Sequence, residues 1–101
     1  MLRMAQYLVE RRLMDVSRRL RKAREELAVA DEQSRALTEA ADEARLRSLV
    51  SETPLAAKES QEAQRHADAM AGARDGLASQ VRRLEHELDE LLDKLVPGSA
   101  D

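Results

Sequence analysis

Apolar residues recur along the first half of the chain in steps that alternate between four and three residues. The positions are Val9, Leu13, Val16, Leu20, Ala23, Leu27, Ala30, Ser34, Leu37, Ala41 and Ala44, with a serine as the one polar member. An undistorted α-helix drifts off such a heptad repeat by roughly 20° per heptad. A run of this length therefore predicts a helix wound left-handedly around a partner helix.

A second run with the same alternation follows in the same chain. Its positions are Ala63, Ala67, Met70, Arg74, Leu77, Val81, Leu84, Leu88, Leu91 and Leu95. Ser51-Glu52-Thr53-Pro54 lies between the runs and is a turn signal. Proline disfavours the α conformation in the residue before it, so Thr53 can cap a second helix that begins at Pro54.

The two runs predict an all-α fold, one long antiparallel two-helix coiled-coil hairpin that could dimerise into a four-helix assembly. We expect a single domain over residues 1–96, with helices at about 2–50 and 54–96, a turn at 51–54 and a frayed tail at 97–101. Pairing the seam positions across the turn places Ala23 opposite Leu84 and Leu37 opposite Met70. This register is centred between Thr53 and Pro54, in agreement with the turn signal.

The charges favour the same antiparallel pairing. Residues 1–24 carry a net charge of +6, and residues 84–95 carry a net charge of −4. The expected ion pairs on the flanks of the seam are Arg19 with Glu87, Arg24 with Glu85, and Arg47 with Glu59. Exposed pairs of this kind contribute about 0.2–1 kcal/mol each, so they orient the helices more than they stabilise them.

Two polar residues interrupt the apolar seam at the same depth. Ser34 and Arg74 lie opposite each other in the predicted register. We interpret them as a polar layer that penalises slipped pairings, with Arg74 reaching outward toward Asp31 or Asp75. The alternative is a docking point for an acidic group of a partner.

Small residues are abundant midway along the predicted hairpin, and they include Gly72 and Gly76. Small side chains allow two helix axes to approach closely. Each glycine costs a helix about 1 kcal/mol relative to alanine, so a hinge is the alternative interpretation.

The composition argues against an enzyme. The 101 residues are 43% hydrophobic, 37% charged and 1% aromatic, and they contain no cysteine. A thin hairpin offers no concave pocket in which to orient a catalytic group. His66 and His86 lie 20 residues apart on one helix, about 30 Å by helical rise, so they cannot share a metal ion. We expect no catalytic residue, no cofactor and no metal.

Other signals bear on the location of the protein. No apolar run approaches the roughly 18 residues that cross a membrane, and the first residues lack the pattern of a signal peptide. These observations favour a cytoplasmic protein without a membrane partner. Among the basic residues, 14 are arginine and 3 are lysine, a bias that together with abundant alanine indicates a GC-rich bacterial genome.

Two apolar clusters fall outside the seam and are candidate partner-binding sites. One lies at the open end of the hairpin (Met1, Met4, Tyr7 and Leu8), and the other lies around the turn (Leu46, Leu49, Val50 and Leu55). Apolar residues rich in methionine suit docking of another protein or of a second copy of the chain. We therefore expect an interaction module, an adaptor or spacer, that forms a homodimer through its open end. A frayed terminus and a closed turn are the simpler alternatives.

The runner-up function is binding of RNA or the ribosome by the basic face of the first helix. Arg11, Arg18 and Lys22 are the candidate phosphate contacts, as the basic residues most free to reach a phosphate. Intramolecular charge pairing competes with this function. The heptad architecture resembles helical-hairpin adaptors such as the flagellar export chaperones of the FliJ type and the coiled-coil arms of some tRNA synthetases. This resemblance covers no diagnostic residues and implies only a fold.

Overall fold

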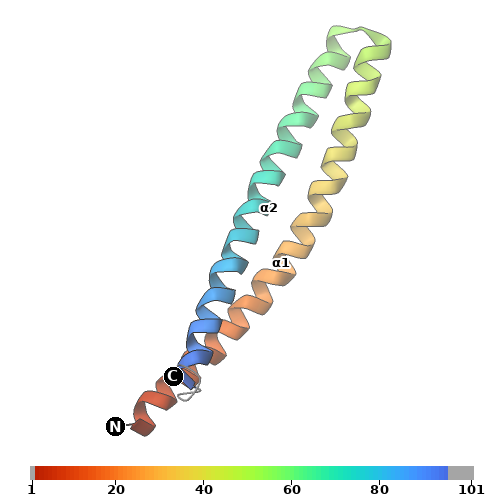
Figure 1. Ribbon diagram of the computed structural model, residues 1–101. Coiled ribbons are helices and arrows are strands. Elements are labelled where there is room, and N and C mark those ends of the chain that lie inside the picture. Colours follow the sequence, from red (N-terminus) through yellow and green to blue (C-terminus); the bar gives the residue numbers. More distant parts are fainter. Residues whose placement is uncertain (1, 96–101) are drawn as a thin grey trace. The chain divides into compact units, whose positions relative to one another are not determined.

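A computed structural model describes residues 2–95 of the chain, which form two helices. Helix α1 spans Leu2–Ser51 and helix α2 spans Pro54–Leu95. Glu52 and Thr53 are the two described residues that lie outside a helix (Figure 1). The predicted all-α two-helix hairpin is confirmed. Met1, Val96 and the predicted frayed tail lie outside the described residues.

The turn between the helices is closed by the residues that the sequence indicated. The Thr53 hydroxyl oxygen accepts a hydrogen bond from the Ala56 amide at 3.2 Å, and its carbonyl accepts one from the Ala57 amide at 3.1 Å. The predicted cap by Thr53 is therefore confirmed. Glu52 donates its amide to the Ser48 carbonyl and has a φ of 51°, a left-handed conformation typical of a helix C-terminus.

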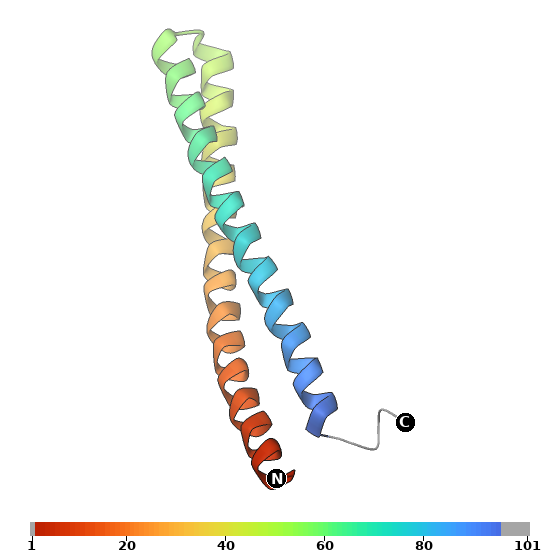
Figure 2. The ribbon, with the colours of Figure 1, turned by 90° about the vertical axis from the view of Figure 1, so that its left-hand side faces the viewer.

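The chain forms two compact units, and each contains a segment of both helices. Of the described residues, 2–26 and 77–95 form the open-end unit, and 27–76 form the tip unit. Within each unit the two helical segments run side by side in opposite directions (Figures 1 and 2).

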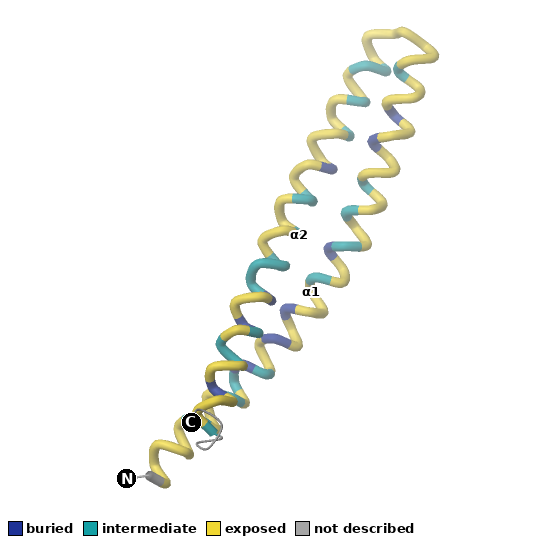
Figure 3. The backbone as a smooth tube through the Cα atoms, in the orientation of Figure 1, coloured by how far each residue is buried: buried dark blue, intermediate teal, exposed yellow. Residues whose placement is uncertain are grey.

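The core of both units consists of the predicted seam. The buried apolar side chains are Val16, Leu20, Ala23, Ala30, Ala41, Ala44, Ala67, Val81, Leu84 and Leu91, and every one is a seam position. The other predicted seam residues are half-buried, so none of the seam residues is exposed. In each unit the buried positions face the neighbouring helix (Figure 3). The heptad pattern is therefore confirmed as the pattern of burial.

The cores of the two units differ in the size of their side chains. In the open-end unit, the buried residues include leucines and valines such as Leu20 and Val81, and Val16 is 0% exposed. In the tip unit, the buried apolar residues are four alanines: Ala30, Ala41, Ala44 and Ala67. Large apolar side chains contribute most of the burial energy of a core. The tip unit therefore has the thinner core.

The interpretation of Gly72 and Gly76 as points of close helix approach is wrong. Both glycines are exposed, and a Cβ atom added to either would meet no atom within 4 Å. The physical reason is their position in the heptad, because the residues that face α1 in this stretch are Met70, Arg74 and Leu77. The hinge interpretation stays a prediction.

Candidate interaction surfaces

Four large aliphatic side chains are exposed around the turn. We call Leu46, Leu49, Val50 and Leu55 the tip surface, and their exposed fractions range from 62% for Leu46 to 85% for Val50. Three of them border a shallow, open depression of about 510 Å³ that is also lined by Arg47, Ser51, Thr53, Ala56 and Glu59. The exposed ends of both helices meet here (Figure 3). The sequence placed these residues correctly outside the seam, and their role in binding stays a prediction.

The charged residues at the rim of this depression do not neutralise each other. Arg47 comes from α1 and Glu59 comes from α2, and both line the depression. Among residues 2–95, neither forms an ion pair within 4.0 Å, in contrast to the expected contact between them. Residues 43–59 carry three basic and three acidic side chains, and their ion pairs are likewise absent from the described structure. The tip therefore presents aliphatic groups beside unpaired charges of both signs.

A second apolar cluster is exposed on the first turns of α1. Met4, Tyr7 and Leu8 are each more than half exposed, and we call them the open-end surface. Met1, which the sequence placed in the same cluster, lies outside the described residues. Met14 and Leu92 are further exposed apolar residues of the open-end unit.

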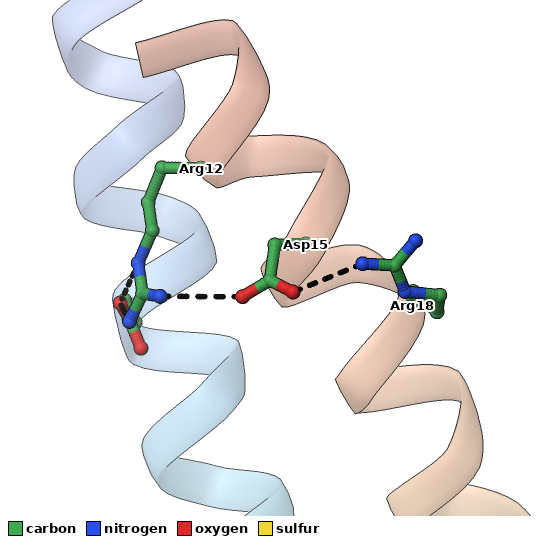
Figure 4. Close-up of polar contacts among 4 residues, drawn as sticks. Arg12, Asp15 and Arg18 are labelled. Carbon is green, nitrogen blue, oxygen red and sulfur yellow. Dashed lines mark hydrogen bonds and ion pairs between the residues drawn. The ribbon is translucent and has the colours of Figure 1, made fainter. Parts of the chain in front are cut away.

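The α1 segment that carries the open-end surface is basic, and the α2 segment of the same unit, residues 84–95, carries a net charge of −4. Residues 3–22 hold seven basic side chains against Glu10 and Asp15. Arg12 donates to Glu87 of α2, with a distance of 2.6 Å between its Nη2 atom and Glu87 Oε1, and it also contacts Asp15 at 3.2 Å. Asp15 in turn accepts a hydrogen bond from Arg18 at 3.0 Å (Figure 4). Asp15 and Glu87 thus pair with two of the seven basic residues, Arg12 and Arg18.

The expected flank pairs are only partly correct. Arg24 pairs with Glu85 at 3.1 Å, as predicted. The predicted pair of Glu87 with Arg19 is wrong, because Glu87 pairs with Arg12. This arginine lies one heptad before Arg19 on the same flank of α1. Asp15 gives the reason, because it holds the Arg12 guanidinium from the other side and so provides this arginine with two carboxylate partners.

The candidate phosphate contacts differ in how far they are available. Arg18 is held by Asp15, although we expected it to be free. Arg11 and Lys22 form no ion pair within the described residues. Lys22 lines a smaller depression of about 210 Å³ together with Arg19, Ala23, Glu26 and Gln80. We did not predict this depression from the sequence. The available signal was the spacing of three residues along one helix face, Arg19, Lys22 and Glu26.

The polar seam residue Arg74 reaches both predicted acids. Its Nε atom donates to Asp31 Oδ1 at 2.5 Å, and its Nη1 atom donates to Asp75 Oδ1 at 3.1 Å. The hydrogen bond to Asp31, followed by that to Asp75, raises the pKa of Arg74 above its ordinary value. Its side chain is 41% exposed, which agrees with the outward path that we expected. Ser34 is half-buried, and its part in a register-fixing layer stays a prediction.

The histidines lie on the surface of α2. His86 contacts Glu90 at 3.0 Å, one helical turn away. His66 lines a depression of about 420 Å³ with Glu62, Arg65 and Ala69. Within residues 2–95, no three side chains of the His, Cys, Asp or Glu type come close enough together to hold a metal ion.

One exposed apolar residue was not expected. Val29 is 55% exposed and belongs to neither apolar cluster. It lies between the seam residues Leu27 and Ala30, and its position outside the heptad seam could have predicted its exposure. An isolated exposed apolar residue is ordinary for a protein surface.

The comparisons with known proteins give no relative for this chain. No protein family model, no curated protein and no solved structure matches it. Among the described residues, neither helix contains a stretch long and apolar enough to span a membrane.

Proposed function

We propose that this chain is a non-enzymatic helical adaptor that docks other proteins through the tip surface and the open-end surface. The heptad seam packs the two helices together in each unit, and the contacts with partners are the exposed apolar groups at the two ends. An adaptor binds the surface of another protein, so this function needs no cofactor and no catalytic pocket. A cytoplasmic location is part of the same proposal.

The observation that carries the proposal is the inverted distribution of apolar side chains in the tip unit. Its buried apolar residues are alanines, whereas its large aliphatic residues Leu46, Leu49, Val50 and Leu55 are exposed. A chain under selection only for the stability of this unit would place large side chains inside. Exposed aliphatic groups gathered beside a depression are typical of a protein contact.

The open-end surface favours a partner of a different kind. Along α1, Met4, Tyr7 and Leu8 are flanked by an excess of basic residues, among which Arg11 has no ion pair in the part of the chain that the structure describes. Methionine and tyrosine provide adaptable apolar contact area, and the arginines attract negative charge. We expect this surface to bind an acidic amphipathic segment of another protein.

Affinity capture with surface variants tests the proposal. The wild-type chain and the variant Met4→Glu with Leu8→Glu are immobilised in parallel, and Val29→Glu serves as a matched control. We expect a bound protein that the control retains and the double variant loses, at salt concentrations that screen simple ion exchange. Equal recovery from all three chains would contradict docking through the open-end surface.

Binding of RNA or the ribosome by the basic face of α1 is the second candidate function. The observation that favours it is the pair of cations Arg11 and Lys22, which have no acidic partner in the described structure. Nucleic-acid binding weakens steeply with added salt, whereas apolar docking does not. Asp15→Asn would release Arg18 and so strengthen RNA binding and steepen its salt dependence by about one phosphate contact. Nuclease treatment before capture separates the two functions.

A further inference from the structure

The tip surface and the open-end surface are surrounded by different patterns of charge. This difference indicates that the two surfaces bind different kinds of partner. A contact between two identical chains about a two-fold axis brings the same patch of both chains together. A patch with one sign of charge then meets the same sign and is repelled. A patch with both signs can meet itself, because each positive group of one chain can lie against a negative group of the other.

The open-end surface meets this condition less well, because its two signs of charge lie on different helices and already pair within the chain. Residues 3–22 of α1 have seven basic side chains against two acidic ones, residues 84–95 of α2 carry a net charge of −4, and Arg12 pairs with Glu87.

The tip surface meets the condition. Arg47 and Glu59 flank one depression from different helices, and neither has an ion-pair partner within the described chain. The neighbouring charges of residues 43–59 are balanced, three against three.

We infer that the tip surface binds the tip surface of a second copy of this chain, with Arg47 of one copy against Glu59 of the other. The aliphatic groups of Leu46, Val50 and Leu55 supply the apolar contact, and the two symmetric ion pairs fix its orientation. This inference rests on the proposed docking function and names one of its partners. The open-end surface of each copy is then free for the acidic partner.

The contact is a weak one. A stable protein interface buries about 800 Å² on each partner, and the tip surface offers only four large aliphatic side chains. Because the apolar area is small, the charges at the rim decide whether two tips associate. Charge variants are therefore the sharpest probe of the contact.

Sedimentation equilibrium of the full chain at low salt tests the inference with two opposite charge reversals. Arg47→Glu gives a tip with two acidic rim residues, and Glu59→Arg gives a tip with two basic ones. Each variant alone should dimerise at least about tenfold more weakly than the wild type, because like charges then face each other twice. An equimolar mixture of the two variants should recover dimerisation to within about threefold of wild type, because every rim contact is again between opposite charges.

The mixture distinguishes a contact between chains from an ion pair within one chain. Both reversals remove the ion pair that Arg47 and Glu59 could form with each other, so an intramolecular role predicts no recovery on mixing. Val50→Glu should also abolish the dimer, since Val50 is 85% exposed and its replacement leaves the core intact. Val29→Glu, outside both surfaces, should leave dimerisation unchanged, and far-UV circular dichroism should show equal helicity for all variants.

Three results would overturn the inference. The wild-type chain could stay monomeric over the whole concentration range, or the mixture of the two charge variants could fail to recover dimerisation. The third result is a dimer that survives Val50→Glu and is lost in Met4→Glu with Leu8→Glu. The last result would place self-association at the open end, as the sequence suggested. None of these results removes the proposed docking function, because affinity capture measures that function separately. Conversely, a tip dimer without any captured protein would leave the inference standing and the adaptor function contradicted.

Discussion

Arg74 and Asp31 are joined across the tip unit by a hydrogen bond of 2.5 Å between Nε and Oδ1. Arg74 occupies a seam position of α2, and Asp31 lies on α1 beside the seam residue Ala30. A buried or half-buried charge at such a position specifies one register at some cost in stability. We therefore expect this contact to select the pairing more than to strengthen it.

Arg74→Leu tests this role. A leucine would fill the seam with apolar volume, and Asp31 would remain partly exposed to water, so we expect a higher midpoint of thermal unfolding. The loss of the polar contact should also broaden the distribution of oligomers in sedimentation velocity. Arg74→Lys, which keeps the charge, is the control. A lower midpoint with a single sedimenting species would show that Arg74 makes a net favourable contact.

The connection between the helices gives a second prediction. Ala23 and Leu84 are both buried in the open-end unit and lie opposite each other in the predicted register. Because the chain contains no cysteine, Ala23→Cys with Leu84→Cys introduces a single thiol pair. Oxidation should crosslink the pair within one chain, as measured by mass spectrometry of the monomer. Crosslinks found only between chains would mean that these segments pair in another arrangement in solution, and Ala23→Cys alone controls for random oxidation.

The backbone of the turn gives a third prediction. Glu52 has a φ of 51°, a left-handed conformation that costs a residue with a Cβ atom roughly 1–2 kcal/mol. Glycine adopts this conformation without that cost but loses more entropy on folding. We expect Glu52→Gly to raise the free energy of unfolding by about 0.5–1 kcal/mol in urea titrations. Glu52→Ala removes the same carboxylate and keeps the Cβ atom, so it should bring no such gain.

The sequence predicted those parts of the fold that depend on backbone periodicity. The burial of Val16, Leu84 and Leu91 follows from the heptad steps alone, and the cap at Thr53 follows from the proline after it. The contacts of long side chains were harder to predict. Glu87 could reach either Arg12 or Arg19, which share one flank, and the choice depended on the position of Asp15.

For the candidate sites too, the sequence predicted which residues are exposed but not how their side chains are arranged. The exposure of Val50 and Leu55 could be predicted because neither is a seam position. The depression beside them could not, since it depends on how Arg47, Ser51 and Glu59 are oriented around the turn. Composition alone misled the reading of Gly72, because an abundance of small residues does not say which helix face they occupy.

The two glycines of α2 provide the last prediction, because the structure removes their packing role. Neither has a positive φ, and the space around each would accept a methyl group without contact. Alanine favours a helix by about 1 kcal/mol over glycine, so Gly72→Ala and Gly76→Ala should each raise the free energy of unfolding by about that amount.

Urea denaturation of the two single variants and the double variant measures this gain, and Ala73→Gly is the reverse control with an expected loss of similar size. If the double variant is stabilised and still captures its partner, the glycines are neutral positions on the surface of α2. If it is stabilised but no longer captures the partner, bending at residues 72–76 contributes to docking, as a hinge requires. An unchanged free energy of unfolding would contradict the assignment of both glycines to a regular, unobstructed helix.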